Sequence, residues 1–149
     1  MISLPKRLIS IIPALILVGA LILVTMLYIS HEVPAAIVKG RSMLPLLREG
    51  DVVFITRCKP SEIGIGDIVI YRSRFEGRLV VHRVVDIKYI NGVYYFVTKG
   101  DNNAIPDYNE FDYNIGVNQA RIVGKVISVD NLVFKIPYVG YLALIIRRA

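Results

Sequence analysis

A serine and a histidine in this sequence have side chains and neighbours suited to nucleophilic catalysis. Ser42 lies in residues 40–45, GRSMLP, where glycine and proline predict a sharp turn. A free serine hydroxyl is a weak nucleophile, so a base must lie beside it. His82, one of two histidines, lies in the valine-rich run VVHRVV, and an imidazole titrates near neutral pH, as a proton shuttle requires. Taken singly, a turn serine and a structural histidine are the ordinary interpretations.

Two aspartates could complete such a site by accepting a hydrogen bond from the imidazole. Asp101 and Asp107 lie in residues 98–107, TKGDNNAIPD, which also has the composition of a solvated polar loop. The Asn-Gly pair at 91–92 predicts a two-residue hairpin turn. Counting strand pairs from that turn places His82 opposite Asp101, within reach of its carboxylate, provided that no bulge interrupts the strands. This register favours Asp101 as the orienting carboxylate.

The segments that must position these side chains alternate apolar and polar residues, with the period of a β-strand. Val, Ile and Tyr are frequent in them, and Gly, Asp and Asn separate them. Strands are predicted at residues 51–56, 67–72, 79–90, 93–99 and 121–129. The fold class predicted is mainly β: an N-terminal transmembrane helix followed by a small antiparallel β-domain.

The predicted transmembrane helix rests on residues 8–29, a run of 22 residues without a charge. A helix of that length can cross a bilayer. A cleavable signal peptide is the alternative, but its apolar region is usually shorter, about 7–15 residues. Lys6 and Arg7 precede the run and predict a cytoplasmic N-terminus. The predicted parts are a cytoplasmic N-terminus (1–7), a single transmembrane helix (8–30), an extracytoplasmic domain (31–134) and an apolar, basic C-terminal segment (135–149).

The C-terminal apolar stretch at 136–146 is too short to span a bilayer, so we expect it to lie on the membrane or against the domain. The net charge of +6 comes mainly from basic residues beside apolar stretches, because residues 31–134 hold 13 basic and 12 acidic side chains. This distribution argues against nucleic acid and favours lipid head groups as the partner of the excess charge. A single cysteine excludes an internal disulfide, and the histidine spacing predicts no metal or other cofactor.

Together these segments resemble the type I signal peptidases, in the Ser/His branch found in archaea and the endoplasmic reticulum. The resemblance rests on GxSMxP at 40–45, VHRV at 81–84 and TKGDNN at 98–103, in that order behind an apolar N-terminal run, and it extends to about Ser128. It implies that Ser42 is the nucleophile and His82 the general base. Asp107 matches the carboxylate of the triad, and Asp101 matches a second acidic residue of the site. The register and the resemblance therefore favour different aspartates. We predict Asp107 as the carboxylate of the triad, because the register assumes that no bulge interrupts the strands, and we keep Asp101 as a supporting or alternative orienting residue.

The resemblance also implies an activity and its partners. The chain is expected to be a membrane-bound serine endopeptidase that removes signal peptides from secreted pre-proteins after small residues, in an Ala-x-Ala-like pattern. It would act at the cell or endoplasmic reticulum membrane, with the lipid bilayer and the translocation machinery as neighbours. One departure is Gly40, where many members have a serine whose hydroxyl helps to bind the oxyanion. Arg41, in place of a small residue, is unexplained.

Two other interpretations of the sequence remain open. Ser42 could work with a lysine, and Lys99 is the lysine nearest to the motif residues. Alternatively, the domain could bind extended peptides without cleaving them, with Ser42 as a turn residue.

Overall fold

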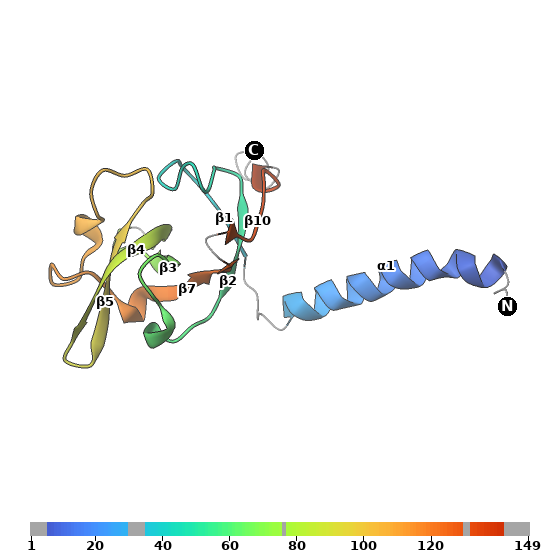
Figure 1. The fold of residues 1–149 in the computed structure, drawn as a ribbon, viewed down its shortest axis with the longest axis horizontal. Coiled ribbons are helices and arrows are strands. Elements are labelled where there is room, and N and C mark those ends of the chain that lie inside the picture. The colour runs from blue at the N-terminus through green and yellow to red at the C-terminus, as the bar shows by residue number, and fades with distance from the viewer. Residues whose placement is uncertain (1–5, 30–34, 76, 130–131, 142–149) are drawn as a thin grey trace. The chain divides into compact units, whose positions relative to one another are not determined.

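The computed structural model describes residues 6–29, 35–75, 77–129 and 132–141, and the chain divides into two compact units, residues 1–34 and 35–149 (Figure 1). The first unit contains helix α1, Lys6–Ile29, of 24 residues with Pro13 inside it. Within the described residues, no helix has both the length and the apolar character needed to cross a membrane. The helix predicted at 8–30 agrees with α1 as far as Ile29, and residue 30 lies outside the described residues. Its crossing of a membrane stays a prediction.

The second unit is built from antiparallel strands, which confirms the mainly β prediction (Figure 1). Seven strands lie side by side in the order β1-β2-β7-β3-β4-β5-β6, and β10 also pairs with β2. Strands β8 and β9 form a separate hairpin. The bounds are β1 Ala35–Ile37, β2 Val52–Thr56, β3 Ile68–Arg72, β4 Leu79–Ile90, β5 Val93–Lys99, β6 Val117–Asn118, β7 Ile122–Val126, β8 Ser128–Val129, β9 Leu132–Val133 and β10 Lys135–Ile136.

Three short 3-10 helices complete the described elements: η1 Pro60–Glu62, η2 Tyr108–Glu110 and η3 Gln119–Arg121. The strand predicted at 121–129 is wrong in one respect, because it is divided into β7 and β8. The other four predicted strands agree with β2, β3, β4 and β5 to within a residue at their starts.

Strand β3 lies at the centre of the unit and has an apolar cluster on each face. Ile68 and Ile70 belong to one cluster, and Val69 and Tyr71 belong to the other. Alternate side chains of a strand point to opposite faces, so β3 is covered on both sides. Tyr71 is fully buried as a result, with no exposed surface. A tyrosine hydroxyl in such a place needs a hydrogen-bond partner.

The hairpin of β4 and β5 turns at Asn91 and Gly92, which both have positive φ, as the predicted two-residue turn requires. The pairing follows the predicted register as far as Asp86 and Val97. A bulge then shifts it by one residue, and Val84 pairs with Thr98. The prediction that His82 lies opposite Asp101 is therefore wrong, because one extra residue in β4 moves every later pair.

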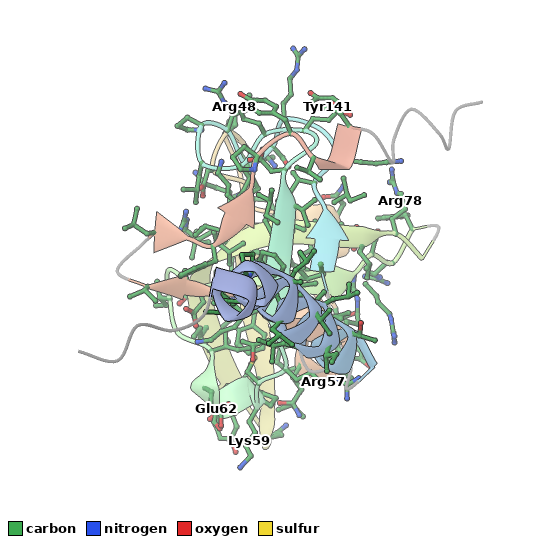
Figure 2. The ribbon with its side chains drawn as sticks, turned by 90° about the vertical axis from the view of Figure 1, so that its right-hand side faces the viewer. Arg48, Arg57, Lys59, Glu62, Arg78 and Tyr141 are labelled. Atoms are coloured by element: carbon green, nitrogen blue, oxygen red, sulfur yellow. The ribbon has the colours of Figure 1, made fainter. Side chains whose placement is uncertain are left out.

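The described C-terminal residues lie against the loop that connects β1 to β2. The Lys135 ammonium group is 2.7 Å from the carboxylate of Asp51, which is 1% exposed, and it also donates to the Leu46 carbonyl. The Gly140 N–H donates to the Gly50 carbonyl. Figure 2 places Arg48 of this loop and Tyr141 at the same end of the unit. Residues 142–149, which complete the predicted membrane-associated segment, lie outside the described residues.

The ion pair between Asp51 and Lys135 predicts a measurable loss of stability on mutation. In Asp51→Asn the side chain keeps its shape but loses the charge that Lys135 neutralises. We expect the free energy of unfolding at neutral pH to fall by about 2–3 kcal/mol in denaturant unfolding of the full chain in detergent. Asp86→Asn is the control, because Asp86 is exposed and makes no ion pair among the described residues. Equal losses in both variants would contradict the assignment.

Candidate active site

Ser42 lies in the loop after β1, where its neighbour Met43 is buried and its own backbone contacts the loop after β5. Met43 is 2% exposed and belongs to the apolar cluster that includes Ile68. The Ser42 carbonyl accepts a hydrogen bond of 2.7 Å from the Asn102 N–H. A Cβ added at Gly100 would lie 2.6 Å from the same carbonyl oxygen, so the loop after β5 approaches the serine backbone closely. These contacts fix the position of the Ser42 backbone.

The imidazole of His82 lies between Ser42 and Asp107 and joins them by hydrogen bonds. His82 Nε2 is 2.9 Å from Ser42 Oγ, and His82 Nδ1 is 2.6 Å from Asp107 Oδ2. His82 and Asp107 are each 8% exposed. An ionised carboxylate can only accept, so Nδ1 carries the proton. In the neutral imidazole Nε2 then accepts, and it faces the serine hydroxyl as a base must.

Asp107 is held by groups from two strands besides His82. Its Oδ2 accepts hydrogen bonds from the Thr98 hydroxyl at 2.7 Å and from the Tyr71 hydroxyl at 3.0 Å. Its N–H donates to the Thr98 carbonyl, and it immediately precedes η2. Burial and the negative charge of Asp107 raise the pKa of Tyr71 well above its usual value of 10, so the phenol stays protonated. Tyr71 and Thr98 lie in strand-like segments of the sequence, and a strand pattern does not say which hydroxyl meets a distant loop.

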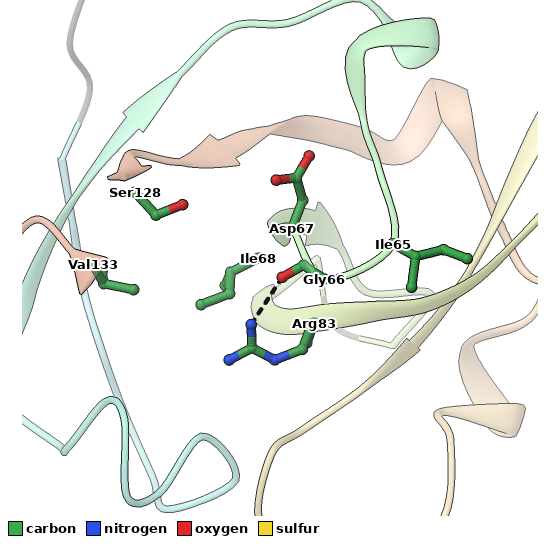
Figure 3. A pocket seen from close by; sticks show the side chains of 7 residues that line it. All are labelled: Ile65, Gly66, Asp67, Ile68, Arg83, Ser128 and Val133. Atoms are coloured by element: carbon green, nitrogen blue, oxygen red, sulfur yellow. Dashed lines mark hydrogen bonds between the residues drawn. The ribbon is translucent and has the colours of Figure 1, made fainter. Parts of the chain in front are cut away.

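Asp101 is not brought to His82, so the geometry does not support the alternative in which Asp101 orients the imidazole. It accepts two hydrogen bonds from Arg83, Nε to Oδ1 at 2.8 Å and Nη2 to Oδ2 at 2.7 Å. Arg83 also donates to the Gly66 carbonyl (Figure 3). The hydrogen bonds from Arg83 to Asp101 raise the pKa of the guanidinium. Asp101 precedes Asn102, which binds the backbone of Ser42, so the ion pair holds the loop beside the serine.

A pocket lies near this ion pair and contains none of the three hydrogen-bonded side chains of Ser42, His82 and Asp107 (Figure 3). It is lined by Ile65, Gly66, Asp67, Ile68, Arg83, Ser128 and Val133. Arg83, in the pocket wall, follows His82 in β4, and neighbouring side chains of a strand point to opposite faces of the sheet. The guanidinium in its wall is already neutralised by Asp101.

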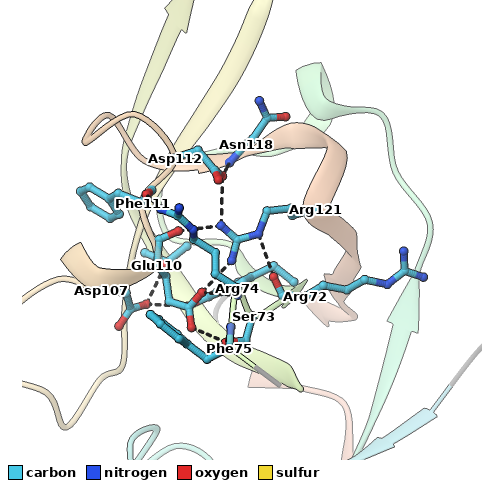
Figure 4. Close-up of polar contacts among 12 residues, drawn as sticks. Arg72, Ser73, Arg74, Phe75, Asp107, Glu110, Phe111, Asp112, Asn118 and Arg121 are labelled. Carbon is cyan, nitrogen blue, oxygen red and sulfur yellow. Dashed lines mark hydrogen bonds and ion pairs between the residues drawn. The ribbon is translucent and has the colours of Figure 1, made fainter. Parts of the chain in front are cut away.

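A second polar cluster supports the turn that carries Asp107 (Figure 4). The Arg121 guanidinium donates to the Glu110 carboxylate at 2.6 Å and to Asp112 at 3.0 Å. Glu110, in η2, also accepts from the Ser73 hydroxyl and the Arg74 N–H. Burial alone would raise the pKa of Glu110, but these three donors outweigh it, so that pKa lies below its usual value.

This cluster predicts how stability depends on pH. Because the folded-state pKa of Glu110 is lowered, its contribution to stability is complete above the unfolded value of about 4.5 and is lost as the pH falls through the folded pKa. We expect Glu110→Gln to cost about 2–3 kcal/mol at pH 7. The difference between wild type and variant should shrink below pH 4.5. Denaturant unfolding at several pH values measures the free energy of unfolding of both proteins. A wild-type-to-variant difference in that free energy that does not change with pH would refute the prediction.

Lys99 does not take the place of His82 in the described structure. Lys99 pairs with Arg83 in the hairpin of β4 and β5, and no hydrogen bond joins Lys99 to Ser42 in the part of the chain described here. The Ser42 hydroxyl instead meets the imidazole. The hydroxyl–imidazole–carboxylate order defines a site of the serine-hydrolase class.

Comparison with known proteins agrees with this class. A family model described as Peptidase S24-like matches residues 17–127, which is most of the chain, and the chain belongs to that family. The signal peptidase complex catalytic subunit SEC11C of Homo sapiens is 32% identical over 120 residues, covering 78% of this chain and 58% of the relative. The subunit SEC11 of Clavispora lusitaniae is 29% identical over 117 residues, covering 78% of this chain and 67% of the relative.

The chain thus spans about 58% of the length of the mammalian relative. These similarities confirm the predicted resemblance to signal peptidases of the endoplasmic reticulum and archaeal branch.

Proposed function

We propose that the chain is a serine endopeptidase that removes signal peptides from secreted pre-proteins, cutting after small residues in an Ala-x-Ala-like pattern. The observation that carries this proposal is the single imidazole of His82, hydrogen-bonded to the Ser42 hydroxyl on one side and to the Asp107 carboxylate on the other. Membership of the Peptidase S24-like family and the names of the relatives support the same reaction.

The proposed reaction passes through an acyl-enzyme. Ser42 Oγ attacks the scissile carbonyl while His82 Nε2 takes its proton. The Asp107 carboxylate stabilises the imidazolium that forms and keeps Nδ1 as the protonated nitrogen. His82 then protonates the leaving amine of the mature protein. A water molecule, activated by the same imidazole, releases the signal peptide from Ser42.

Gly40 leaves the oxyanion without the side-chain donor that many members have. A Cβ at Gly40 would meet no atom within 4 Å, but its φ of +83° is one that other residues adopt only with strain. The backbone N–H of Ser42 is the donor that we propose for the oxyanion. Loss of one such donor costs about 2.7–4 kcal/mol in a serine protease, so we expect slow turnover unless substrate contacts compensate.

We further propose, from the sequence alone, that residues 8–30 anchor the domain in the cell or endoplasmic reticulum membrane. Lys6 and Arg7 would keep the N-terminus cytoplasmic and place the domain on the outer face. There the enzyme and the end of a translocated signal peptide would share one surface, which raises their effective concentration. The lipid bilayer and the translocation machinery are the neighbours that this location implies.

The test uses the full chain in detergent with a pre-protein that has Ala-x-Ala before its mature N-terminus. We expect cleavage after the second alanine, read by mass spectrometry of both products, and no cleavage when that alanine is replaced by tryptophan. An acylating serine-protease inhibitor should label Ser42. If neither product nor labelling appears, the proposed activity is wrong and a peptide-binding β-domain becomes the better interpretation.

A further inference from the structure

We propose that Tyr71 is a positioning residue for this reaction, whose hydroxyl holds the Asp107 carboxylate in the orientation that fixes His82. The inference deepens the proposed function and rests on it. It starts from the fact that three donors from three strands meet one carboxylate oxygen: the Tyr71 hydroxyl from β3, the Nδ1–H of His82 from β4 and the Thr98 hydroxyl from β5.

The pairing of strands β3 and β4 is enough to place Tyr71 near the imidazole, and no loop residue is needed. His82 pairs with Val69, and Tyr71 lies two residues further along β3, so its side chain is on the same face. The Tyr71 side chain therefore lies on the same face of the sheet as the imidazole, and its hydroxyl donates to Asp107 Oδ2 at 3.0 Å. A phenylalanine would fill the same space but would offer no donor.

The ring of Tyr71 has both apolar and cationic neighbours. It packs in the apolar cluster with Val84, Phe96 and Val117. The Arg121 guanidinium carbon lies 5.8 Å from the ring centroid, in cation–π geometry. Arg121 also binds Glu110 in η2, immediately after Asp107. Tyr71 thus connects a rigid ion-pair cluster to the carboxylate.

This arrangement matters because Asp107 lies in a connecting segment, whereas His82 lies in a strand. A carboxylate that is free to turn about its own axis would hold the Nδ1–H of His82 only part of the time. Two hydroxyl donors on Oδ2, from Tyr71 and Thr98, restrict that rotation and keep the oxygen aimed at the imidazole. Tyr71 has no exposed surface, so it cannot contact a substrate directly.

The test compares Tyr71→Phe with Tyr95→Phe in the full chain in detergent. Tyr95 is also buried, at 8% exposed, but it does not donate to Asp107. We expect Tyr71→Phe to lower kcat by about 10- to 100-fold, the effect of one hydrogen bond to a charged group, with KM unchanged. Tyr95→Phe should leave both constants within about twofold of wild type. A Tyr71→Phe enzyme with the kcat of wild type would overturn the proposal.

A second measurement does not depend on cleavage. The chain has two histidines, so ¹⁵N-labelled protein gives few imidazole signals, and His82 can be assigned from a His82→Gln sample. We expect the Nδ1–H proton of His82 to exchange with solvent at least tenfold faster in Tyr71→Phe than in wild type or Tyr95→Phe. Unchanged exchange would refute the positioning role. Wild type that cleaves no pre-protein would instead refute the proposed function, while the exchange data still report on Tyr71.

Discussion

Ser42→Ala is expected to lower kcat for pre-protein cleavage by about 10⁴- to 10⁶-fold, as removal of the nucleophile does in other serine proteases. The hydroxyl 2.9 Å from His82 Nε2 is the atom that forms the acyl-enzyme in the proposed reaction. Removing one oxygen leaves Met43 in the apolar core and the backbone contact with Asn102 intact, so the site should keep its shape. The assay follows the cleaved fraction of an Ala-x-Ala pre-protein in detergent.

Ser61→Ala is the matched control, because Ser61 is an exposed serine in η1 and lies outside the hydrogen-bonded site. We expect it to keep the activity of wild type. Circular dichroism should be the same for both variants and wild type, which separates loss of chemistry from loss of folding. Near-normal cleavage by Ser42→Ala, with cleavage at the same bond, would exclude Ser42 as the nucleophile.

His82→Ala is expected to lower kcat about as much as Ser42→Ala, because the two groups act as one unit in a serine protease. The decisive comparison is with Lys99→Ala. If a lysine were the base, Lys99→Ala would abolish cleavage and His82→Ala would not. We expect Lys99→Ala to stay within about tenfold of wild type, since the described hydrogen bond to the Ser42 hydroxyl comes from the imidazole.

The kcat values of the two single variants should be compared with that of the double variant Ser42→Ala, His82→Ala. If the two residues form one unit, the double variant should be no slower than either single one. Losses that multiply would mean that Ser42 and His82 act independently, and the proposed proton transfer between them would be wrong.

Asp101 and Asp107 show how much of this site could be predicted from the sequence. The resemblance pointed to Asp107 and the hairpin register pointed to Asp101. The register was correct at the turn, from Ile90 and Val93 up to Asp86 and Val97, because Asn-Gly strongly favours a two-residue turn. It was wrong beyond Val85, which is the extra residue of the bulge. No local pattern in a valine-rich strand marks which valine is left unpaired.

In the rest of the chain, too, features that depend on neighbouring residues could be predicted from the sequence. Alternation of apolar residues was enough to locate β2 to β5, because the period of a strand is written in neighbouring residues. The GxSMxP, VHRV and TKGDNN segments were enough to identify the family. The sequence also suggested a membrane-spanning helix, which the described residues do not support.

The sequence by itself determined the strand pattern, the hairpin turn and the family to which the chain belongs, since each of these depends on residue types at short spacing. The resemblance in sequence already indicated Asp107 as the partner of His82. Only the tertiary structure decided that Asp101 pairs with Arg83, and that Tyr71 and Thr98 donate to the Asp107 carboxylate oxygen. The physical reason is that a shift of one residue in pairing moves a side chain to the other face of a sheet. That shift is set by packing between strands far apart in the chain.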